Sequence, residues 1–414
     1  MHHANLQREF ALEVVHKLRA AGFEALWAGG CVRDQLLGLE PKDYDVATNA
    51  RPEQIRDLFG QKRTLAIGAS FGVITVLGRR PQGQIEVATF RTDAAYSDGR
   101  HPDSIAFTTA ERDAQRRDFT INGLFFDPVA GEVVDYVGGR ADLEHQLLRA
   151  IGDPRARFAE DKLRMLRAVR FAAAFGFAIE PETLAAIQAM APQITTVSAE
   201  RIGAEVRRML VDGNRATALV MLREAKLLPQ VLPEVDRLDG AAWSDTCRVL
   251  ANLLEPTLAM ALAALLLHVA DENAAGALGR RLRYTNREIE RTQWLLGQLK
   301  LIRAAPQVFW PRLQRVLVHQ DAGELVALYA AIAGDGDAAL AFVRERLAWP
   351  QERLNPLPLI DGSDLIRHGL APSPEFARLL EAVRDAQLDG EIETVAGAMT
   401  LVQRLVAGES LESP

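Results

Sequence analysis

The spacing of hydrophobic residues divides the chain into a first part with mixed patterns and a longer second part with one pattern. Residues 7–20 repeat apolar positions at intervals of three and four, which predicts a helix. The β-rich runs at 71–78 and 84–90 predict a hairpin. Tyr44 to Val46 reads as the middle of a further strand. The first 140 residues therefore predict a small sheet with helices.

After residue 140 the strand signals stop, and amphipathic helical spacing continues almost to the end of the chain. Pro356 and Pro358 interrupt this pattern and mark a boundary before a last helical segment. The expected helical segments are 155–175, 181–190, 198–211, 214–226, 241–268, 286–300, 311–332 and one near 374–388. The pattern predicts an α+β protein, with a mixed-sheet head followed by a long all-α region.

Composition indicates a folded globular protein in a reducing compartment. Apolar residues make up 48% of the 414 residues and charged residues 25%. Cys31 and Cys247 lie far apart, which argues against a disulfide scaffold and favours a cytoplasmic location. The longest apolar stretch, 258–267, is about half of the ~20 residues that a membrane helix needs, so we expect no membrane span. The net charge of −7 excludes a protein that coats nucleic acid through a generally basic surface, but it allows a local basic groove.

The first candidate site combines a glycine turn with two carboxylates. Gly29 and Gly30 precede a short helix, where backbone N–H groups can approach a phosphate, and Arg33 can add a charged hydrogen bond. Asp43 and Asp45 are two residues apart on the expected strand and would point to one face. Such a pair suits Mg²⁺, which takes few protein oxygens and completes its shell with water and phosphates. Each half alone is a common turn or loop pattern, and the combination is the specific signal.

The segment from Arg116 to Asn122 forms a second candidate. Arg117 could bind a phosphate and Asn122 a ribose hydroxyl. The alternative is a solvated helix end in which Asp118 pairs locally, and the segment alone does not decide between the two.

A third candidate lies between Phe158 and Phe171. On one helix, Asp161 and Arg164 would be neighbours, and Arg164, Arg167 and Arg170 would form a stripe with too few acids nearby to neutralise it. The alternative is a surface ladder of ion pairs.

A carboxylate beside an arginine also matches one edge of cytosine and adenine, which offers an amino donor next to a ring-nitrogen acceptor. Uracil and guanine reverse that pattern, and an unpaired buried group costs about 1–3 kcal/mol.

These motifs together resemble a known family. The chain contains, in this order, GGCVRDQLLGLEPKDYDVAT, RRDFTING, EDKLRMLRAVRF and SAERIGAEVRRML. This series is similar to class II tRNA nucleotidyltransferases, the CCA-adding enzymes, in a superfamily shared with bacterial poly(A) polymerases. The resemblance implies a nucleotidyltransferase head at 1–140, a helical neck at 141–211, a body at 212–350 and a tRNA-binding tail at 351–414.

The resemblance also implies roles for individual residues. Asp43 and Asp45 would be catalytic and hold Mg²⁺, with Glu86 as a possible further acid or a structural carboxylate. The nucleotide would be bound by the two glycines of the turn and seven side chains. Gly29, Gly30 and Arg33 would lie at the triphosphate, Arg117 and Asn122 at a phosphate or the ribose, Asp161 and Arg164 at the base, and Arg167 and Arg170 near the triphosphate. Glu200 and Arg201 would brace the neck helices.

Within the superfamily, three segments favour CCA addition. Phe90 to Pro102 resembles the flexible loop that helps to switch from C to A. Residues 67–72 lack the basic stretch typical of poly(A) polymerases. Residues 358–392 resemble the tail of CCA-adding enzymes, where a helix N-terminus could meet a tRNA phosphate. His268 has no convincing metal-ligand partners in sequence, so we expect no phosphohydrolase site.

The sequence therefore predicts an enzyme that adds C, C and A to the 3′ end of tRNA. Its substrates would be CTP and ATP, its cofactor Mg²⁺, and pyrophosphate the second product. We expect no membrane association and no protein partner. The alternatives are an enzyme that adds only the terminal A, a poly(A) polymerase, or an RNA-binding protein without catalysis.

Overall fold

The computed structural model describes residues 2–93 and 105–407. These residues form two compact units. The first contains residues up to 243 together with 281–283, and the second contains 244–280 and the residues from 284 onward. The four-part division into head, neck, body and tail is finer than this and stays a prediction.

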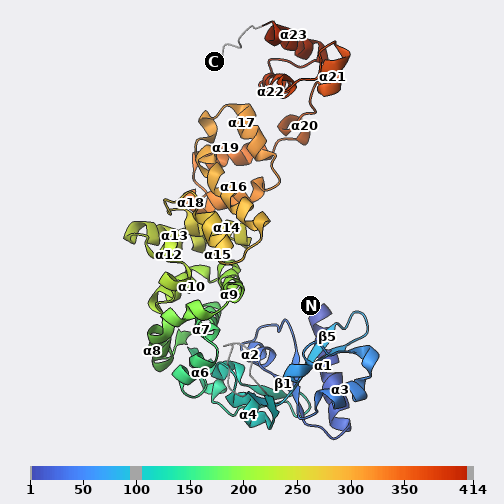
Figure 1. Ribbon diagram of the computed structural model, residues 1–414, viewed down its shortest axis with the longest axis vertical. Helices are drawn as coiled ribbons and strands as arrows, with labels where there is room; N and C mark the ends of the chain where they lie inside the picture. Colours follow the sequence, from blue (N-terminus) through green and yellow to red (C-terminus); the bar gives the residue numbers. More distant parts are fainter. Residues whose placement is uncertain (1, 94–104, 408–414) are drawn as a thin grey trace. The chain divides into compact units, whose positions relative to one another are not determined.

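A mixed seven-stranded sheet organises the start of the first unit (Figure 1). Its order within the described residues is β3-β4-β5-β2-β1-β8-β9. The strands are β1 (Ala25–Ala28), β2 (Asp45–Thr48), β3 (Thr64–Leu65), β4 (Val73–Leu77), β5 (Gln84–Thr89), β8 (Phe125–Asp127) and β9 (Glu132–Val134). Strands β2 and β5 run parallel and the other neighbours antiparallel. The predicted hairpin is confirmed as β4–β5.

Four helices accompany this sheet: α1 (His2–Ala20), α2 (Gly30–Leu36), α3 (Pro52–Phe59) and α4 (Ala110–Gln115). Helix α1 packs on β1, β2 and β5. One core cluster joins Leu26, Ala47, Phe90 and Phe125 to Ala114 of α4. Burial alternates along β5, so its apolar side chains face inward and Glu86 is exposed. This places an acid on the sheet face away from the core.

Two further strand pairs lie outside this sheet. Strands β6 (Arg91–Asp93) and β7 (Ile105–Phe107) pair antiparallel. Strands β10 (Leu147–Leu148) and β11 (Ala178–Ile179) form a parallel pair beyond helix α5 (Gly139–Glu144). The expectation of no strands after residue 140 is therefore wrong, because two-residue strands are too short to show a periodic pattern.

The rest of the first unit is mainly helical. It contains α6 (Pro154–Glu160), α7 (Leu163–Phe175), α8 (Pro181–Met190), α9 (Ala199–Val211), α10 (Arg215–Glu224), α11 (Leu228–Val231) and α12 (Pro233–Asp236), with short 3₁₀ helices at Thr120–Asn122 (η3) and Ala191–Thr196. The single helix expected at 155–175 is wrong, because the backbone is extended at Asp161 (φ −143°, ψ 104°). Helix α7 ends at Gly176, which adopts the left-handed conformation.

Helices also make up the second unit. They are α13 (Gly240–Asn252, which begins in the first unit), α14 (Leu258–Leu266), α15 (Ala274–Arg281), α16 (Asn286–Arg303), α17 (Trp310–Leu317), α18 (Ala322–Ala333), α19 (Ala338–Leu347), α20 (Gln351–Leu354), α21 (Gly362–Arg367), α22 (Glu375–Leu388) and α23 (Val395–Val406). The segments expected at 241–268 and 311–332 are each divided into two helices. Helix α23 follows the segment that we expected to be last. All nine residues of α14 are buried, as its uninterrupted apolar sequence predicts.

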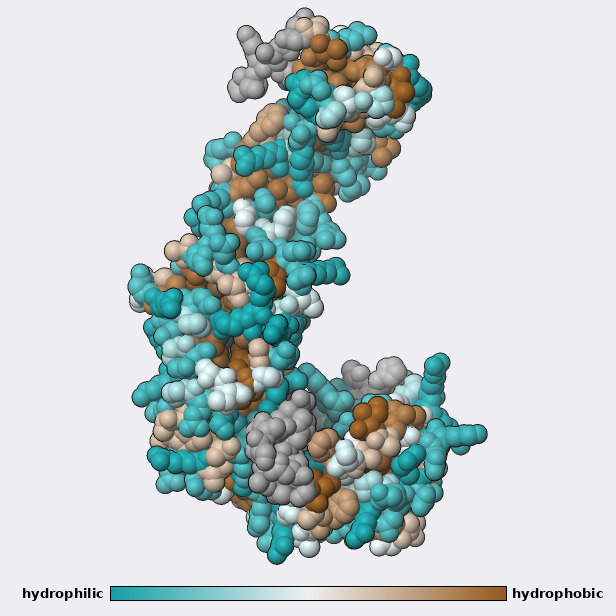
Figure 2. All heavy atoms as spheres, viewed as in Figure 1, coloured by the Kyte–Doolittle hydropathy of each residue, from teal (hydrophilic) through white to brown (hydrophobic). Residues whose placement is uncertain are grey.

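The predicted α+β fold class is confirmed, with a mixed-sheet head and a helical remainder. On the face drawn in Figure 2, hydrophilic residues predominate and apolar residues gather in limited patches. Among the described residues no single helix is long and apolar enough to cross a membrane, although the bent pair α17 and α18 meets the criteria of length and composition.

Candidate nucleotide-binding and catalytic site

One cavity in the first unit brings together the residues singled out in sequence. Its volume is about 1100 Å³. It is lined by Gly29, Gly30, Arg33, Asp43, Asp45, Arg117, Asn122, Asp161, Arg164, Arg167 and Arg170, which are all eleven predicted site residues. The lining also includes Lys42, Glu86, Arg91, Arg116, Asp118, Leu163, Phe171, Arg201 and Arg208. Segments up to 179 residues apart in sequence therefore meet at one place, from Gly29 to Arg208 (208 − 29 = 179).

A tight backbone approach forms the floor of the cavity between β1 and α2. Gly29 has a positive φ of 72°, and its N–H donates to the carbonyl of Leu124 at 3.0 Å. A Cβ atom on Gly29 would lie 2.8 Å from Nη1 of Arg117. Glycine is therefore required at this position both for its conformation and for the space that Arg117 occupies.

A chain of hydrogen bonds connects the head to helix α7. Arg33 donates to Oδ1 of Asn122 at 2.5 Å, and Nδ2 of Asn122 donates to Asp118 at 3.1 Å. Arg167 of α7 donates two hydrogen bonds to Oδ2 of Asp118, at 2.8 and 2.6 Å. Burial raises the pKa of Asp118, but Arg167 and the hydrogen bonds outweigh that effect and hold the pKa at about 2. The ionised Asp118 therefore links α2, η3 and α7.

Asp113 of α4 holds two of the cavity arginines. Its carboxylate accepts from Arg116 at 2.7 Å and from Arg117 at 3.1 Å, and it also accepts from the backbone N–H of Arg91 at 3.2 Å. Burial raises the pKa of Asp113, but Arg117, Arg116 and the Arg91 N–H together bring it below its usual value. Sequence reasoning missed Asp113, although its spacing of three and four residues from the arginines was a usable signal.

The acidic part of the cavity lies where β2 begins. Asp45 is the first residue of β2 and is the register partner of Glu86 on β5. Asp43 lies two residues before the strand, so the expectation that both aspartates stand on it is wrong, although both line the cavity. Desolvation and the nearby Glu86 carboxylate raise the pKa of Asp45 to about 6, with Asp43 adding to this and Arg117 opposing it.

The backbone between α6 and α7 positions the two predicted base-reading side chains. Asp161 accepts from the N–H of Leu163 at 3.0 Å and from Arg201 of α9 at 2.7 Å. Arg164 donates to the carboxylate of Glu160 and, at 2.9 Å, to the carbonyl of Arg157. Arg164 is buried, with 8% of its surface exposed. Both side chains are therefore fixed by neighbours before any ligand arrives.

Each arginine of the stripe has an acidic partner, so the expectation of arginines without a protein partner is wrong. Two of these acids are shared with Arg157 and Arg208, however, so an excess of positive charge remains. Arg164 pairs with Glu160, Arg167 pairs with Asp118, and Arg170 pairs with Glu205 of α9 at 2.5 Å. Two of these acids come from segments 49 and 35 residues away in sequence, so local spacing could not reveal them. Glu200 and Arg201 were expected to brace the neck helices. Arg201 of α9 pairs with Asp161 between α6 and α7, whereas Glu200 lies 3.6 Å from Arg283.

Two further predicted features lie outside the cavity or outside the described residues. Tyr96, Asp98, Arg100 and Pro102 of the expected flexible loop lie outside the described residues. The N-terminus of α21 is capped by the carboxylate of Asp361, which accepts from the N–H groups of Ser363 and Asp364. A phosphate therefore does not fit that helix end as it stands.

Two observations concern possible metal-binding sites. His268 Nε2 lies 2.8 Å from a carboxylate oxygen of Asp245. In the part of the chain that the structure describes, no group of three or more His, Cys, Asp or Glu residues is arranged to hold a metal.

Comparison with known proteins decides the family. Residues 25–149 match the family described as the poly A polymerase head domain, and residues 176–238 match the probable RNA and SrmB-binding site of polymerase A. A CCA-adding enzyme of Lactobacillus helveticus is 33% identical over 398 residues, which cover 94% of this chain and 95% of that protein. The chain belongs to the family of CCA-adding enzymes.

Two other CCA-adding enzymes match this chain, one over about half of its length and one over nearly all of it. The enzyme of Enterococcus faecalis is 44% identical over 217 residues, about half of the length of each chain. The crystal structure of the Bacillus stearothermophilus enzyme in complex with CTP is 28% identical, covers 97% of this chain and 98% of its own, and has a TM-score of 0.79. CCA-adding enzymes are tRNA nucleotidyltransferases, so the predicted enzyme class is confirmed.

Proposed function

We propose that the protein adds C, C and A to the 3′ end of tRNA, using CTP and ATP and releasing pyrophosphate. The observation that carries this proposal is the single cavity in which all eleven predicted residues meet, in a chain of the CCA-adding family. In this reaction the 3′ hydroxyl of tRNA attacks the α-phosphate, and the bond from that phosphorus to the leaving pyrophosphate breaks.

The arginines and the glycine turn would bind the triphosphate. Gly30 begins α2, and a Cβ there would come no closer than 3.7 Å to Arg33, so the turn leaves its backbone open to the cavity. Each guanidinium has five N–H donors, so Arg117, Arg167 and Arg170 keep donors for phosphate beyond those used on their acids. Asn122, held between Arg33 and Asp118, would contact the ribose.

Asp43 and Asp45 would hold Mg²⁺. The cavity fits a cation, because Asp45 is the register partner of Glu86 at the start of β2 and lines the cavity together with Asp43. Burial and the Glu86 carboxylate raise the pKa of Asp45. Bound magnesium would favour deprotonation of the tRNA hydroxyl and stabilise charge on the leaving pyrophosphate. The protein's own part is to place these two carboxylates beside the arginine-rich wall.

Asp161 and Arg164 would select the base. Asp161 offers carboxylate oxygens as hydrogen-bond acceptors and pairs with Arg201, and Arg164 lines the same cavity as a donor. Cytosine and adenine match this pair, whereas uracil and guanine would set donor against donor and acceptor against acceptor, and a mismatched buried group costs about 1–3 kcal/mol.

Primer extension on three RNA substrates tests the proposed function. The substrates are tRNA lacking all three terminal nucleotides, tRNA ending in CC, and an unrelated RNA, each with CTP, ATP or both. We expect complete CCA on the shortest tRNA and no transfer by Asp43→Asn or Asp45→Asn proteins that keep their melting temperature. A single A added only after CC would identify an A-adding enzyme, and long A tails on any RNA would identify a poly(A) polymerase.

A further inference from the structure

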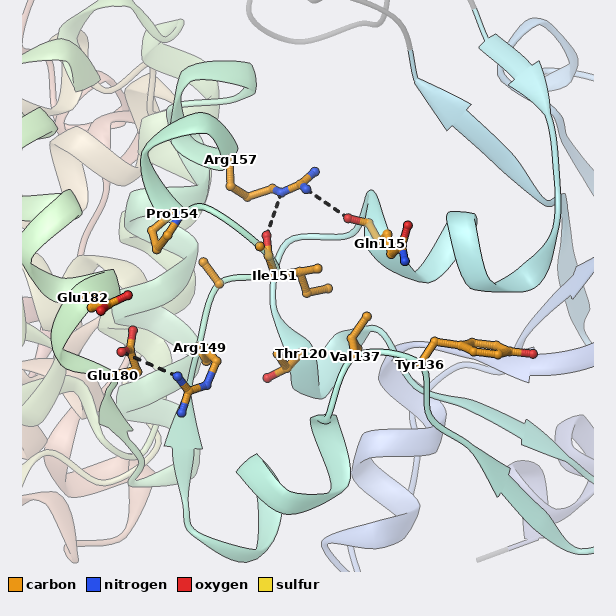
Figure 3. A pocket seen from close by; sticks show the side chains of 12 residues that line it. Gln115, Thr120, Tyr136, Val137, Arg149, Ile151, Pro154, Arg157, Glu180 and Glu182 are labelled. Atoms are coloured by element: carbon orange, nitrogen blue, oxygen red, sulfur yellow. Dashed lines mark hydrogen bonds and ion pairs between the residues drawn. The ribbon is translucent and has the colours of Figure 1, made fainter.

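Arg157 of α6 lies beside the site but does not line its cavity. It lines a separate hollow of about 480 Å³, together with Gln115 and Ile151 (Figure 3). Its Nε donates to the carbonyl of Ile151 at 3.2 Å, and its Nη2 donates to the carbonyl of Gln115 at 3.0 Å. Nη1 also donates to the carbonyl of Arg116 at 3.3 Å. One guanidinium thus joins α6 to the last residue of α4 and to Arg116, which directly follows α4 and lines the cavity.

The same guanidinium supports Arg164, the donor of the proposed base-reading pair. Nη1 of Arg157 donates to the Glu160 carboxylate at 3.0 Å, and that carboxylate also accepts from Arg164. The backbone carbonyl of Arg157 accepts from Arg164 at 2.9 Å. Arg157 and Glu160 therefore hold the Arg164 side chain, although neither of them lines the cavity.

Asp161, the acceptor of the pair, has a different set of supports. Its two oxygens are held by Arg201 and by the N–H of Leu163, and neither contact involves Arg157 or Glu160. Donor and acceptor are thus held independently, so a change at Arg157 should disturb the donor alone.

We propose that Arg157 is a positioning residue for nucleotide selection, which acts through Glu160 to fix the Arg164 donor toward the ring nitrogen of cytosine or adenine. This inference rests on the proposed function, in which Asp161 and Arg164 read the base. The competing role is a structural brace between α4 and α6 with no effect on base recognition. If Arg157 positions Arg164, a mutation of Arg157 should impair only substrates that have the ring nitrogen. If Arg157 is only a brace, the mutation should impair all nucleotides equally.

A substrate analogue separates these roles. In 3-deazacytidine triphosphate a C–H replaces the ring nitrogen, so Arg164 has no acceptor, while the amino group facing Asp161 remains. We would measure kcat and KM for CTP and for this analogue on tRNA lacking CCA, with the wild-type, Arg157→Gln and Arg155→Gln proteins. Arg155 is the matched control, because it lies exposed on the same helix and its only described hydrogen bond is made by its backbone N–H.

We expect Arg157→Gln to lower kcat/KM for CTP by about tenfold to a hundredfold, because a misplaced positioning group costs about that much. We expect kcat/KM for the analogue to change by less than about twofold, because the analogue has no acceptor for Arg164. Arg155→Gln should leave both values at the wild-type level. An equal loss for CTP and the analogue would show that Arg157 is only a brace. No loss for CTP would overturn the proposal equally.

Glu160→Gln is the second variant, in case Arg157→Gln does not fold. It removes the charge that links Arg157 to Arg164 but leaves the bonds of Arg157 to the carbonyls of α4. The same selective loss with CTP is expected, and its absence in a folded Glu160→Gln protein would contradict the proposal. Arg164→Met tests the proposed function on which this inference rests. If this variant prefers CTP over the analogue as strongly as the wild type does, Arg164 does not read the base, and this result does not depend on the role of Arg157.

Discussion

At the scale of single residues, the two adjacent glycines of the turn have different roles. Gly29 has a positive φ and no space for a Cβ, whereas Gly30 has ordinary space around its Cα. We expect Gly29→Ala to lower the free energy of unfolding by about 1–2 kcal/mol, because alanine is strained in the left-handed region, and to displace Arg117. Thermal melting and nucleotide-transfer assays would measure the two effects.

Gly30→Ala is the matched control for this prediction. It should keep the melting temperature, since alanine is the better helix former at the start of α2. If the triphosphate approaches the Gly30 backbone, the variant should raise KM for CTP. A Gly29→Ala protein as stable as the wild type would contradict the argument from backbone conformation.

Much of the site was predictable at this scale, because the glycines, the two aspartates and the arginines carry their chemistry in local sequence. Their partners were not predictable. The acids that neutralise Arg167 and Arg170 are Asp118 and Glu205, and they reach α7 only through the fold. Residue type indicates what a side chain can do, but not which of its hydrogen bonds are already in use.

At the scale of elements, the break between α6 and α7 gives Asp161 two functions. Its carboxylate caps the first turn of α7 through the Leu163 N–H, and it faces the cavity. Asp161→Ala should lose both functions, whereas Asp161→Ser should keep the cap. We expect serine to restore stability lost in the alanine variant, about 1 kcal/mol, without restoring discrimination against UTP.

Urea unfolding and misincorporation of UTP would measure these two consequences separately. Equal stability of the alanine and serine variants would argue against the capping role. Retained discrimination in both variants would argue against base reading by Asp161.

The link from η3 to α7 predicts a pH-dependent contribution to stability. The pKa of Asp118 lies at about 2 in the folded protein, below its ordinary value of 3.8. The ionised carboxylate therefore stabilises the fold by about 2 kcal/mol above pH 3.8, and this contribution is lost as the pH falls toward 2. Urea midpoints of wild type and Asp118→Asn should differ at pH 7 and converge in acid. A difference that stays constant down to pH 3 would contradict the assignment.

Apolar spacing in the sequence predicted most of the longer helices, among them α8, α9, α10 and α22. The errors occurred where a local feature interrupts a periodic pattern. The extended backbone at Asp161 divides one expected helix, and a break near Pro256 divides another. The strand pair β10–β11 and the position of Asp43 depend on contacts between distant segments, which periodicity does not record.

At the scale of the whole molecule, a protein of net charge −7 is proposed to bind a polyanion. Binding must then depend on local groups of cations, such as the arginines of the cavity, and on release of counterions from the RNA. We expect KM for tRNA to rise more than about tenfold between 50 and 200 mM salt. Initial rates at several tRNA concentrations would measure this, and a KM insensitive to salt would contradict electrostatic binding.

The fixed pair of Asp161 and Arg164 also limits how finely the protein can distinguish the four bases. One acceptor beside one donor divides the four bases into two classes, which is a single binary choice at each addition. Because C and A fall in the same class, these two side chains alone cannot specify the order C, C, A. The order therefore depends on something besides this pair, such as the growing 3′ end of the RNA, which differs after each addition.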